Sequence, residues 1–337
     1  MGKRIGKNTI VFENKPRIIN FASVCGKKEA QGPLGDQFDK VFEDTTMNES
    51  SWEKAESRLQ TEAVNTALEK ANLKSQEINY IFAGDLLNQC MSSAFGLRSL
   101  GIPFLGQFGA CSTMAQTLFL ASSVIEAGIS DYSVAVTSSH YCSSERQFRF
   151  PLQYGGQRTP TAQWTVTGAG AAIIGNSGEG PYISKATVGK IVDLGIKDVN
   201  NMGAAMAPAA AKTMLSFFED TKTHPSEYDM IFSGDLGEVG SNLLREILLK
   251  ESYRLGDNYN DCGLMIYHKE EQDVHAGGSG CGCSASVFCS IILRKLREKT
   301  WNNVLFMATG ALMSPTSCQQ GETIPGVAHL INIRNDL

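Results

Sequence analysis

The sequence predicts a layered α/β protein built from two similar halves. Residues 77–87 (EINYIFAGDLL) and 227–237 (EYDMIFSGDLG) are identical at six of eleven positions. Each copy follows an amphipathic segment and reads as a helix, a polar loop, a buried strand and a Gly-Asp turn. Helical segments also alternate with short, continuous apolar strands. This alternation is typical of crossover units in a parallel or mixed sheet buried on both faces.

The elements of the first half follow from apolar runs and from residues that favour helix starts. Residues 51–71 form an amphipathic segment that opens with Ser51, a good helix-start residue. In chain order we expect a strand at residues 9–12, a helix over 51–71, the strand of the 77–87 copy, a helix opening at or just after Cys111, and strands at 132–137 and 171–174.

The second half repeats this order. Pro208 suits the first turn of a helix, where its missing N–H group costs nothing, so we expect a helix over residues 208–219. A weaker echo aligns Cys283 with Cys111, and both precede a helical pattern and a strand ending in Thr. The Gly, Pro and Ser cluster at 176–181 marks the connection, so the predicted halves are residues 1–177 and 178–337, packed tightly together.

The composition is that of a globular protein. The 337 residues carry 30 Lys and Arg against 35 Asp and Glu, a net charge of −5 with neutral His, and 42% are hydrophobic. These values exclude disorder as the default state. The chain has no block of like charges that would indicate a nucleic-acid or polybasic membrane surface, so we expect a small-molecule or protein partner and no nucleic acid.

The sequence also bears on location. No apolar run approaches the roughly 20 residues of a transmembrane helix. The first residues run directly into the strand at 9–12, without a secretory apolar stretch. We therefore expect a chain that stays on the cytosolic side, where it is made. Nine cysteines, odd in number and irregularly spaced, favour reduced thiols over a disulfide framework.

Cys111 is the candidate nucleophile. Residues 103–116 read as a strand, a tight Gly-Ala turn and a helix that opens at Cys111. A thiol there lies near the positive end of the helix dipole and near unpaired N–H groups, which favour thiolate and bind anions. The alternative is a small buried residue at a crowded turn, a common place for free cysteine.

A duplicated α/β chain with Cys at this turn resembles the thiolase superfamily. Its condensing enzymes, such as β-ketoacyl synthase III, are five-layered αβαβα proteins with two mixed sheets, and that Cys accepts the acyl group. The resemblance implies a His at the strand end after the second copy and an Asn or His before the second-half helix. Residues 232–236 (FSGDL) and 276–280 (AGGSG) contain neither partner.

Because both partners are missing, we expect no enzymatic activity. Condensation needs donors to the developing oxyanion and a base for the thiol, and Ser, Gly and Asp do not replace an imidazole. A carboxylate such as Asp235 would repel an enolate. His275 lies five residues before Gly280, so it is the missing His only if the alignment with the superfamily pattern is shifted. His140, beyond the strand at 132–137, is the better pocket candidate, although a lone loop His is more often a surface or hydrogen-bonded residue.

Eight short motifs, several of them uncommon, point to one family within the superfamily. They are residues 31–35 (QGPLG), 83–89 (AGDLLNQ), 108–113 (FGACST), 137–140 (TSSH), 145–151 (ERQFRFP), 153–157 (QYGGQ), 260–267 (NDCGLMIY) and 276–281 (AGGSGC). They resemble the stage V sporulation protein AD family, a thiolase-fold component of the channel that moves dipicolinic acid into spores of Firmicutes. The resemblance implies a noncatalytic subunit that binds dipicolinic acid, or its calcium chelate, for uptake into the developing spore. It also implies membrane-embedded partner subunits that hold the chain at the spore inner membrane.

Dipicolinate is a flat pyridine with two carboxylates, so its site needs two sets of anion donors and a narrow apolar slot. We expect the helix start at residues 111–113 to bind one carboxylate. Arg146 or Arg149 is expected to fork onto the other, with Phe148 or Phe150 against the ring. The alternative is that the arginines pair with surface carboxylates or bridge a dimer.

Small residues at 279 and 280 leave room for a ligand beside the thiol. The full candidate set is Cys111, Ser112, Thr113, His140, Arg146, Arg149, Ser279, Gly280 and Cys283.

We expect no metal and no cofactor. Residues 281–283 (CGC) have the wrong spacing for a zinc knuckle, and no second Cys or His pair supports them. The Gly-rich residues 277–282 lack the Lys-Ser/Thr of a P-loop. Close backbone packing between the halves is the simpler explanation.

Three functions remain open at this stage. The first is noncatalytic ligand binding, which the missing catalytic partners and the motif set favour. The second is acyl transfer or condensation by Cys111. The third is a scaffold that docks channel subunits without a ligand. The superfamily alone also implies a homodimer in which the central sheets of two subunits are continuous.

Overall fold

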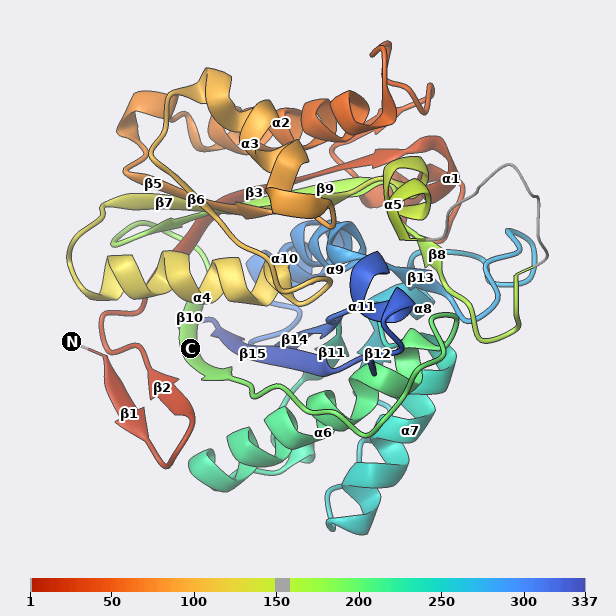
Figure 1. Cartoon of the computed structure of the whole chain (residues 1–337). Coiled ribbons are helices and arrows are strands. Elements are labelled where there is room, and N and C mark those ends of the chain that lie inside the picture. The colour runs from red at the N-terminus through yellow and green to blue at the C-terminus, as the bar shows by residue number, and fades with distance from the viewer. Residues whose placement is uncertain (1, 149–157, 337) are drawn as a thin grey trace.

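The computed structural model describes residues 2–148 and 158–336. Its helices and strands form five layers, in which two sheet layers each lie between helices (Figure 1). The expected αβαβα arrangement is therefore confirmed. The predicted division at residues 177 and 178 stays a prediction.

The upper sheet layer contains strands of the first half. β5 (Tyr80–Gly84) lies between β7 (Tyr132–Ser139) and β6 (Phe104–Gly106) and is parallel to both. The layer is completed by β9 (Gly168–Gly175), β3 (Arg17–Gly26) and β4 (Lys40–Phe42). Helices α2 (Trp52–Ala71) and α3 (Met91–Leu97) cover its outer face (Figure 1).

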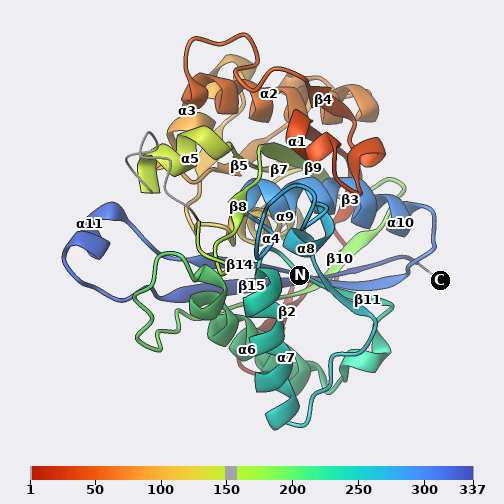
Figure 2. The same ribbon diagram turned by 90° about the vertical axis from the view of Figure 1, so that its right-hand side faces the viewer.

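The lower layer repeats the same pattern. β11 (Met230–Ser233) lies between β14 (Asn303–Ala311) and β12 (Tyr259–Asp261) and is parallel to both. The layer is completed by β15 (Gly326–Arg334), β10 (Tyr182–Val188), β1 (Lys3–Ile5) and β2 (Thr9–Val11). Helices α6 (Met202–Thr221) and α7 (Gly237–Lys250) cover the outer face (Figure 2). The two eleven-residue copies thus place equivalent strands in equivalent positions.

A helical layer separates the sheets. It consists of α4 (Thr113–Glu126), α9 (Cys281–Val287), a π-helical turn (Phe288–Ile292) and α10 (Leu293–Arg297). Its apolar side chains, among them Leu118 and Phe288, are fully buried in the largest core cluster. Short elements complete the fold: α1 (Lys27–Ala30), α5 (Tyr141–Phe148), β8 (Trp164–Thr165), α8 (Cys262–Met265), β13 (Gly278–Ser279) and α11 (Pro315–Gln319).

The two expected sheets are joined by hydrogen bonds at one point. β10 of the lower layer pairs with β3 of the upper layer at Tyr182 and Arg17. The described strands therefore form one 13-stranded mixed sheet that passes through both layers. The bonds at the junction run from the N–H of Ile18 to the carbonyl of Pro181 and from the N–H of Ile183 to that of Pro16, each 2.8 Å long.

The expected start of α6 at Pro208 is wrong. The helix begins at Met202, and the side chain of Asn201 caps it by accepting from the N–H of Ala204 at 3.3 Å. Pro208 therefore stands in the seventh position, where proline removes one backbone hydrogen bond. Packing of the buried face of α6 against the lower sheet outweighs this local cost.

The structure also bears on two predictions, that the chain has no membrane-spanning helix and that its cysteines are reduced. In the described ranges, no helix combines the length and the apolar character that crossing a bilayer requires. All nine cysteines are free, and seven of them are buried.

Candidate functional site

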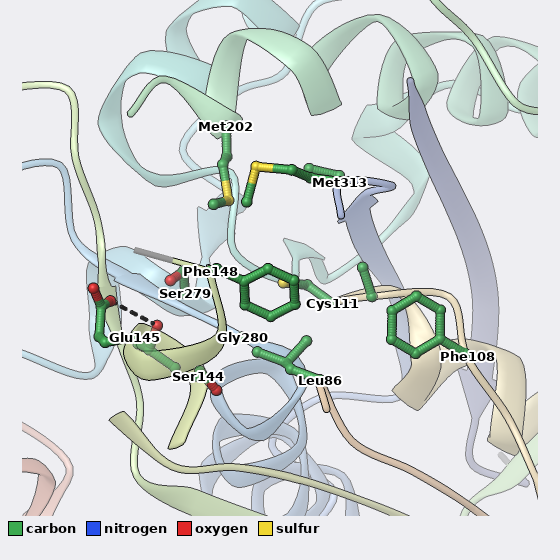
Figure 3. A pocket seen from close by; sticks show the side chains of 13 residues that line it. Leu86, Phe108, Cys111, Ser144, Glu145, Phe148, Met202, Ser279, Gly280 and Met313 are labelled. Atoms are coloured by element: carbon green, nitrogen blue, oxygen red, sulfur yellow. Dashed lines mark hydrogen bonds between the residues drawn. The ribbon is translucent and has the colours of Figure 1, made fainter. Parts of the chain in front are cut away.

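A pocket lies beside Cys111, where the upper layer, the lower layer and α5 meet. Its volume is about 40 Å³, which is room for roughly three waters. Figure 3 shows the ring of Phe148 beside Leu86 and Cys111, with Met202 and Met313 above them. The described lining residues are Leu86, Phe108, Ala110, Cys111, Ser144, Glu145, Phe148, Thr165, Met202, Ser279, Gly280, Ala311 and Met313.

The pocket has an apolar side and a small polar side. Glu145 and Ser279 lie together at one end (Figure 3), and Glu145 accepts a hydrogen bond from Thr165 Oγ1 at 3.4 Å. The described lining therefore includes one carboxylate and no Lys or Arg. None of the described lining side chains therefore carries a positive charge that could compensate the charge of an anionic ligand.

Cys111 stands where the sequence places it, between β6 and the start of α4, and it lines the pocket. The buried carboxyl group of Asp235 lies close enough to this thiol to affect its ionisation. Burial raises the pKa of Cys111 well above its ordinary value, and the charge of Asp235 raises it further. The expectation that the helix start favours a thiolate is thus wrong, because desolvation and a neighbouring carboxylate outweigh the helix dipole.

Asp235 organises the floor of the site. Its side chain is fully buried and accepts from the N–H of Gly280 at 2.8 Å and from Thr309 Oγ1 at 2.9 Å. Burial raises the pKa of Asp235 to about 6. This carboxyl occupies the segment where a condensing enzyme of the superfamily is expected to carry its His.

Asp261 fixes the turn that presents Asp235. It accepts from Ser233 Oγ at 2.6 Å and from the N–H groups of Leu236 and Gly237 at 2.8 and 3.0 Å. Burial raises the pKa of Asp261 to about 7. Sequence reasoning missed this role, although Asp261 belongs to one of the quoted motifs.

Ser112 and Thr113 are fully buried, and neither lines the pocket. Their hydroxyls donate to the carbonyls of Gly109 and Ala110, at 2.7 and 2.6 Å. The expectation that they bind a ligand carboxylate is therefore corrected, because the tight turn before α4 uses both hydroxyls itself.

His140 is buried behind β7 and does not line the pocket. Its Nε2 lies 2.8 Å from the carbonyl of Thr45, and its Nδ1 accepts from the N–H of Cys142 at 3.2 Å. Burial lowers the pKa of His140, so the ring is neutral. It serves as a structural hydrogen-bonding residue, which is the alternative that its sequence position left open.

Arg146 points away from the pocket. It forms an ion pair with Glu53, and its guanidinium lies 5.3 Å from the centre of the Trp52 ring. The surface-pair alternative therefore describes its position. Arg149 and Phe150 lie outside the described residues, whereas Phe148 lines the pocket as expected.

Ser279 and Gly280 line the pocket as expected. Gly280 has a φ of +106°, and a Cβ on it would lie 2.7 Å from Ser139 Oγ, so only glycine fits there. Cys283 is fully buried one turn further into α9 and does not reach the pocket. Its thiol lies 3.8 Å from the carbonyl of Gly234. The inclusion of Cys283 is thus corrected, because the helix turns its side chain into the core.

Sequence reasoning missed several walls of the pocket. Ser144 and Glu145 lie on α5, a helix that begins at Tyr141 and that the sequence analysis did not expect. Met202 comes from the unexpected first turn of α6, and Met313 follows β14. Asn201 is of a residue type that favours helix starts, so it could have predicted a helix beginning at Met202. No local pattern indicated that α5, the start of α6 and the end of β14 lie next to one another.

No metal site is evident from residue clustering. Over residues 2–148 and 158–336, no group of three or more His, Cys, Asp or Glu side chains is arranged to hold an ion.

Comparison with known proteins identifies the family of this chain. A model of the stage V sporulation protein AD family (SpoVAD) matches residues 6–334. The chain belongs to this family. It is 48% identical over 327 residues to stage V sporulation protein AD of Bacillus subtilis strain 168, covering 97% of this chain and 96% of that protein.

Solved structures confirm the family's thiolase-like fold in this chain. The 3-oxoacyl-[acyl-carrier-protein] synthase III of Aquifex aeolicus matches with a TM-score of 0.57 and 14% identity, over 95% of this chain and 100% of that one. The acetamide-bound form of Xanthomonas campestris OleA matches with a TM-score of 0.61 and 12% identity, over 96% of this chain and 100% of that one. At these identities the likeness shows the fold alone.

Proposed function

We propose that this SpoVAD-family chain is a noncatalytic ligand-binding protein. The observation that carries the proposal is that the Cys111 thiol is buried beside the fully buried carboxyl group of Asp235, which raises the pKa of the thiol. A nucleophilic cysteine needs a cationic or basic partner that generates the thiolate, as an imidazole does. A carboxylate in that place stabilises the neutral thiol and opposes any anionic intermediate beside it.

The proposed ligand is dipicolinic acid or its calcium chelate. The apolar walls formed by Phe148, Leu86 and the two methionines suit the faces of a flat ring, and the polar end at Glu145 and Ser279 suits a carboxyl group. Because the pocket has room for only about three waters, these side chains must move apart to admit the acid. Because the described lining has a carboxylate and no cation, a dianion would be poorly compensated. A protonated acid or the calcium chelate avoids this cost.

A calorimetric titration tests the proposal. Dipicolinate is titrated with and without calcium chloride, and isophthalate, which lacks the ring nitrogen, serves as the comparison ligand. We expect saturable binding of dipicolinate that is tighter than that of isophthalate. Phe148→Ala removes the wall against the ring and should weaken binding about tenfold. Phe95→Ala is the matched control, because Phe95 is an exposed phenylalanine outside the pocket.

Two results would count against this function. Absence of dipicolinate binding to the folded protein, with or without calcium, favours a scaffold role. Transfer or hydrolysis of acyl-CoA that is lost in Cys111→Ala favours the acyl-transfer role.

We also propose a homodimer formed through β6. This strand lies at the edge of the sheet, and Phe104 and Leu105 on it are 39% and 44% exposed. An apolar, unpaired sheet edge favours pairing with another strand. We expect a dimer in sedimentation velocity and its weakening by Leu105→Lys; a monomer at micromolar concentration contradicts the proposal.

The proposed location is the surface of the spore inner membrane, where membrane-embedded subunits of the same sporulation channel hold the chain. Family membership and the motif set support this proposal. We expect the chain to sediment with spore membranes and to be released when those subunits are deleted. Recovery in the soluble fraction of both strains would contradict it.

A further inference from the structure

We propose that the Ser144 hydroxyl recognises the ligand by donating a hydrogen bond to an acceptor atom at the edge of a flat ring. This inference rests on the proposed ligand-binding function and adds a recognition residue to it. Ser144 lies in α5, is 2% exposed and lines the pocket. Its Oγ is buried and has no hydrogen-bond partner among the described residues.

The local helix explains why this hydroxyl is free. A helical serine commonly bonds to the carbonyl four residues earlier, which here is that of His140. That oxygen already accepts from the N–H of Ser144 at 3.1 Å and from Ser143 Oγ at 3.0 Å. A carbonyl oxygen has two lone pairs, so no place is left for Ser144.

The neighbouring side chains are already engaged elsewhere. Ser143 also approaches Glu56, at 2.7 Å, and thereby connects α5 to α2. Thr165 donates to Glu145 at the polar end of the pocket. The side chains on either side of Ser144 thus have protein partners, whereas the Ser144 hydroxyl has none in the part of the chain that the structure describes.

A buried hydroxyl without a partner destabilises the unliganded protein, and a ligand acceptor removes that cost. Three other buried serine hydroxyls of the described chain also lack a partner: Ser23, Ser122 and Ser286. None of these three lines the pocket. Among these four serines, only Ser144 belongs to the described lining of the pocket.

The surroundings define the ligand class. Leu86 and Phe148 make the pocket apolar, so the ligand body is flat and apolar. Ser144 is a neutral donor and selects for an acceptor, which in a pyridine carboxylic acid is a carboxyl oxygen or the ring nitrogen. Recognition by a hydroxyl also differs from the arginine fork that the sequence suggested.

The test compares Ser144→Ala with Ser122→Ala. Both changes remove a buried hydroxyl that has no partner from a helix, but Ser122 lies in α4, away from the pocket. Without ligand, we expect both variants to melt at or above the temperature of the wild type. With dipicolinate, Ser144→Ala should bind about ten- to a hundredfold more weakly, and Ser122→Ala should bind as the wild type does.

The comparison ligand locates the acceptor. If Ser144 donates to the ring nitrogen, Ser144→Ala reduces the preference for dipicolinate over isophthalate. If it donates to a carboxyl oxygen, both ligands weaken equally, and either result supports the proposal.

Two results overturn the inference while leaving the proposed function intact: Ser144→Ala binds dipicolinate as tightly as the wild type, or unliganded Ser144→Ala melts well below Ser122→Ala, which would reveal a structural partner. Failure of the wild type itself to bind either acid overturns both proposals.

Discussion

Glu56 gives the sharpest prediction for stability, because two carboxyl groups are buried together behind the pocket. Glu56 of α2 and Asp85 after β5 are both inaccessible to solvent. Glu56 accepts from Ser138 Oγ at 3.2 Å, and its other carboxyl oxygen lies 2.7 Å from Ser143 Oγ. Burial and the charge of Asp85 raise the pKa of Glu56 to about 8. The folded protein therefore holds a proton on this pair at neutral pH.

The sign of the pH dependence follows from this proton. The folded pKa lies above the unfolded value, so the group's contribution to stability is lost as the pH rises towards 8. At 1.36 kcal/mol for each pH unit, the wild type should lose about 4 kcal/mol of unfolding free energy between pH 5 and pH 8 from this group. Glu56→Gln carries no titrating proton and should escape that loss.

The assay is urea unfolding at several values between pH 5 and pH 9. The difference in unfolding free energy between Glu56→Gln and the wild type should grow in favour of the variant up to about pH 8 and then level off. Glu62→Gln is the matched control, because Glu62 lies on the same helix but forms an exposed ion pair with Lys40. Parallel curves for the wild type and Glu56→Gln across this range would refute the reasoning.

Three further predictions follow from single contacts. Cys111 should react with iodoacetamide at pH 7.5 more slowly than free cysteine, because burial and Asp235 raise its pKa; mass spectrometry showing an equal or faster rate contradicts this. Asp220→Ala should cost about 2 kcal/mol, because Asp220 accepts from three successive N–H groups of residues 7–9; unchanged hydrogen exchange at those amides would show that the contact is unimportant. Gly280→Ala should destabilise by roughly 1 to 3 kcal/mol, since a φ of +106° strains any side chain; an unchanged melting temperature would disprove it.

Much of the fold was readable from local pattern. The two eleven-residue copies became β5 and β11, each between two parallel neighbours. The segment from Ser51 became α2, with the Ser51 side chain accepting from the N–H of Lys54. Such elements depend on apolar periodicity and on capping within a few residues, which a sequence displays directly. The start of α6 was misjudged because Pro208 is a strong local signal that tertiary packing overrides.

The site was readable only in part. Cys111, Phe148, Ser279 and Gly280 reach the pocket as expected, since each stands at or near an element end that the sequence marks. Arg146 does not, because α5 directs its side chain towards Glu53 on α2. The direction of a side chain on a short helix depends on how that helix packs, and no periodicity fixes it.

The sequence by itself determined the layered fold, the position of Cys111 at the start of α4 and the absence of the expected His from residues 232–236. Only the tertiary structure decided the state of that thiol. The carboxyl of Asp235 lies 124 positions along the chain from Cys111, yet folding buries the two side chains beside each other. There the cost of burying a charge exceeds the attraction of a helix dipole, so the cysteine stays neutral.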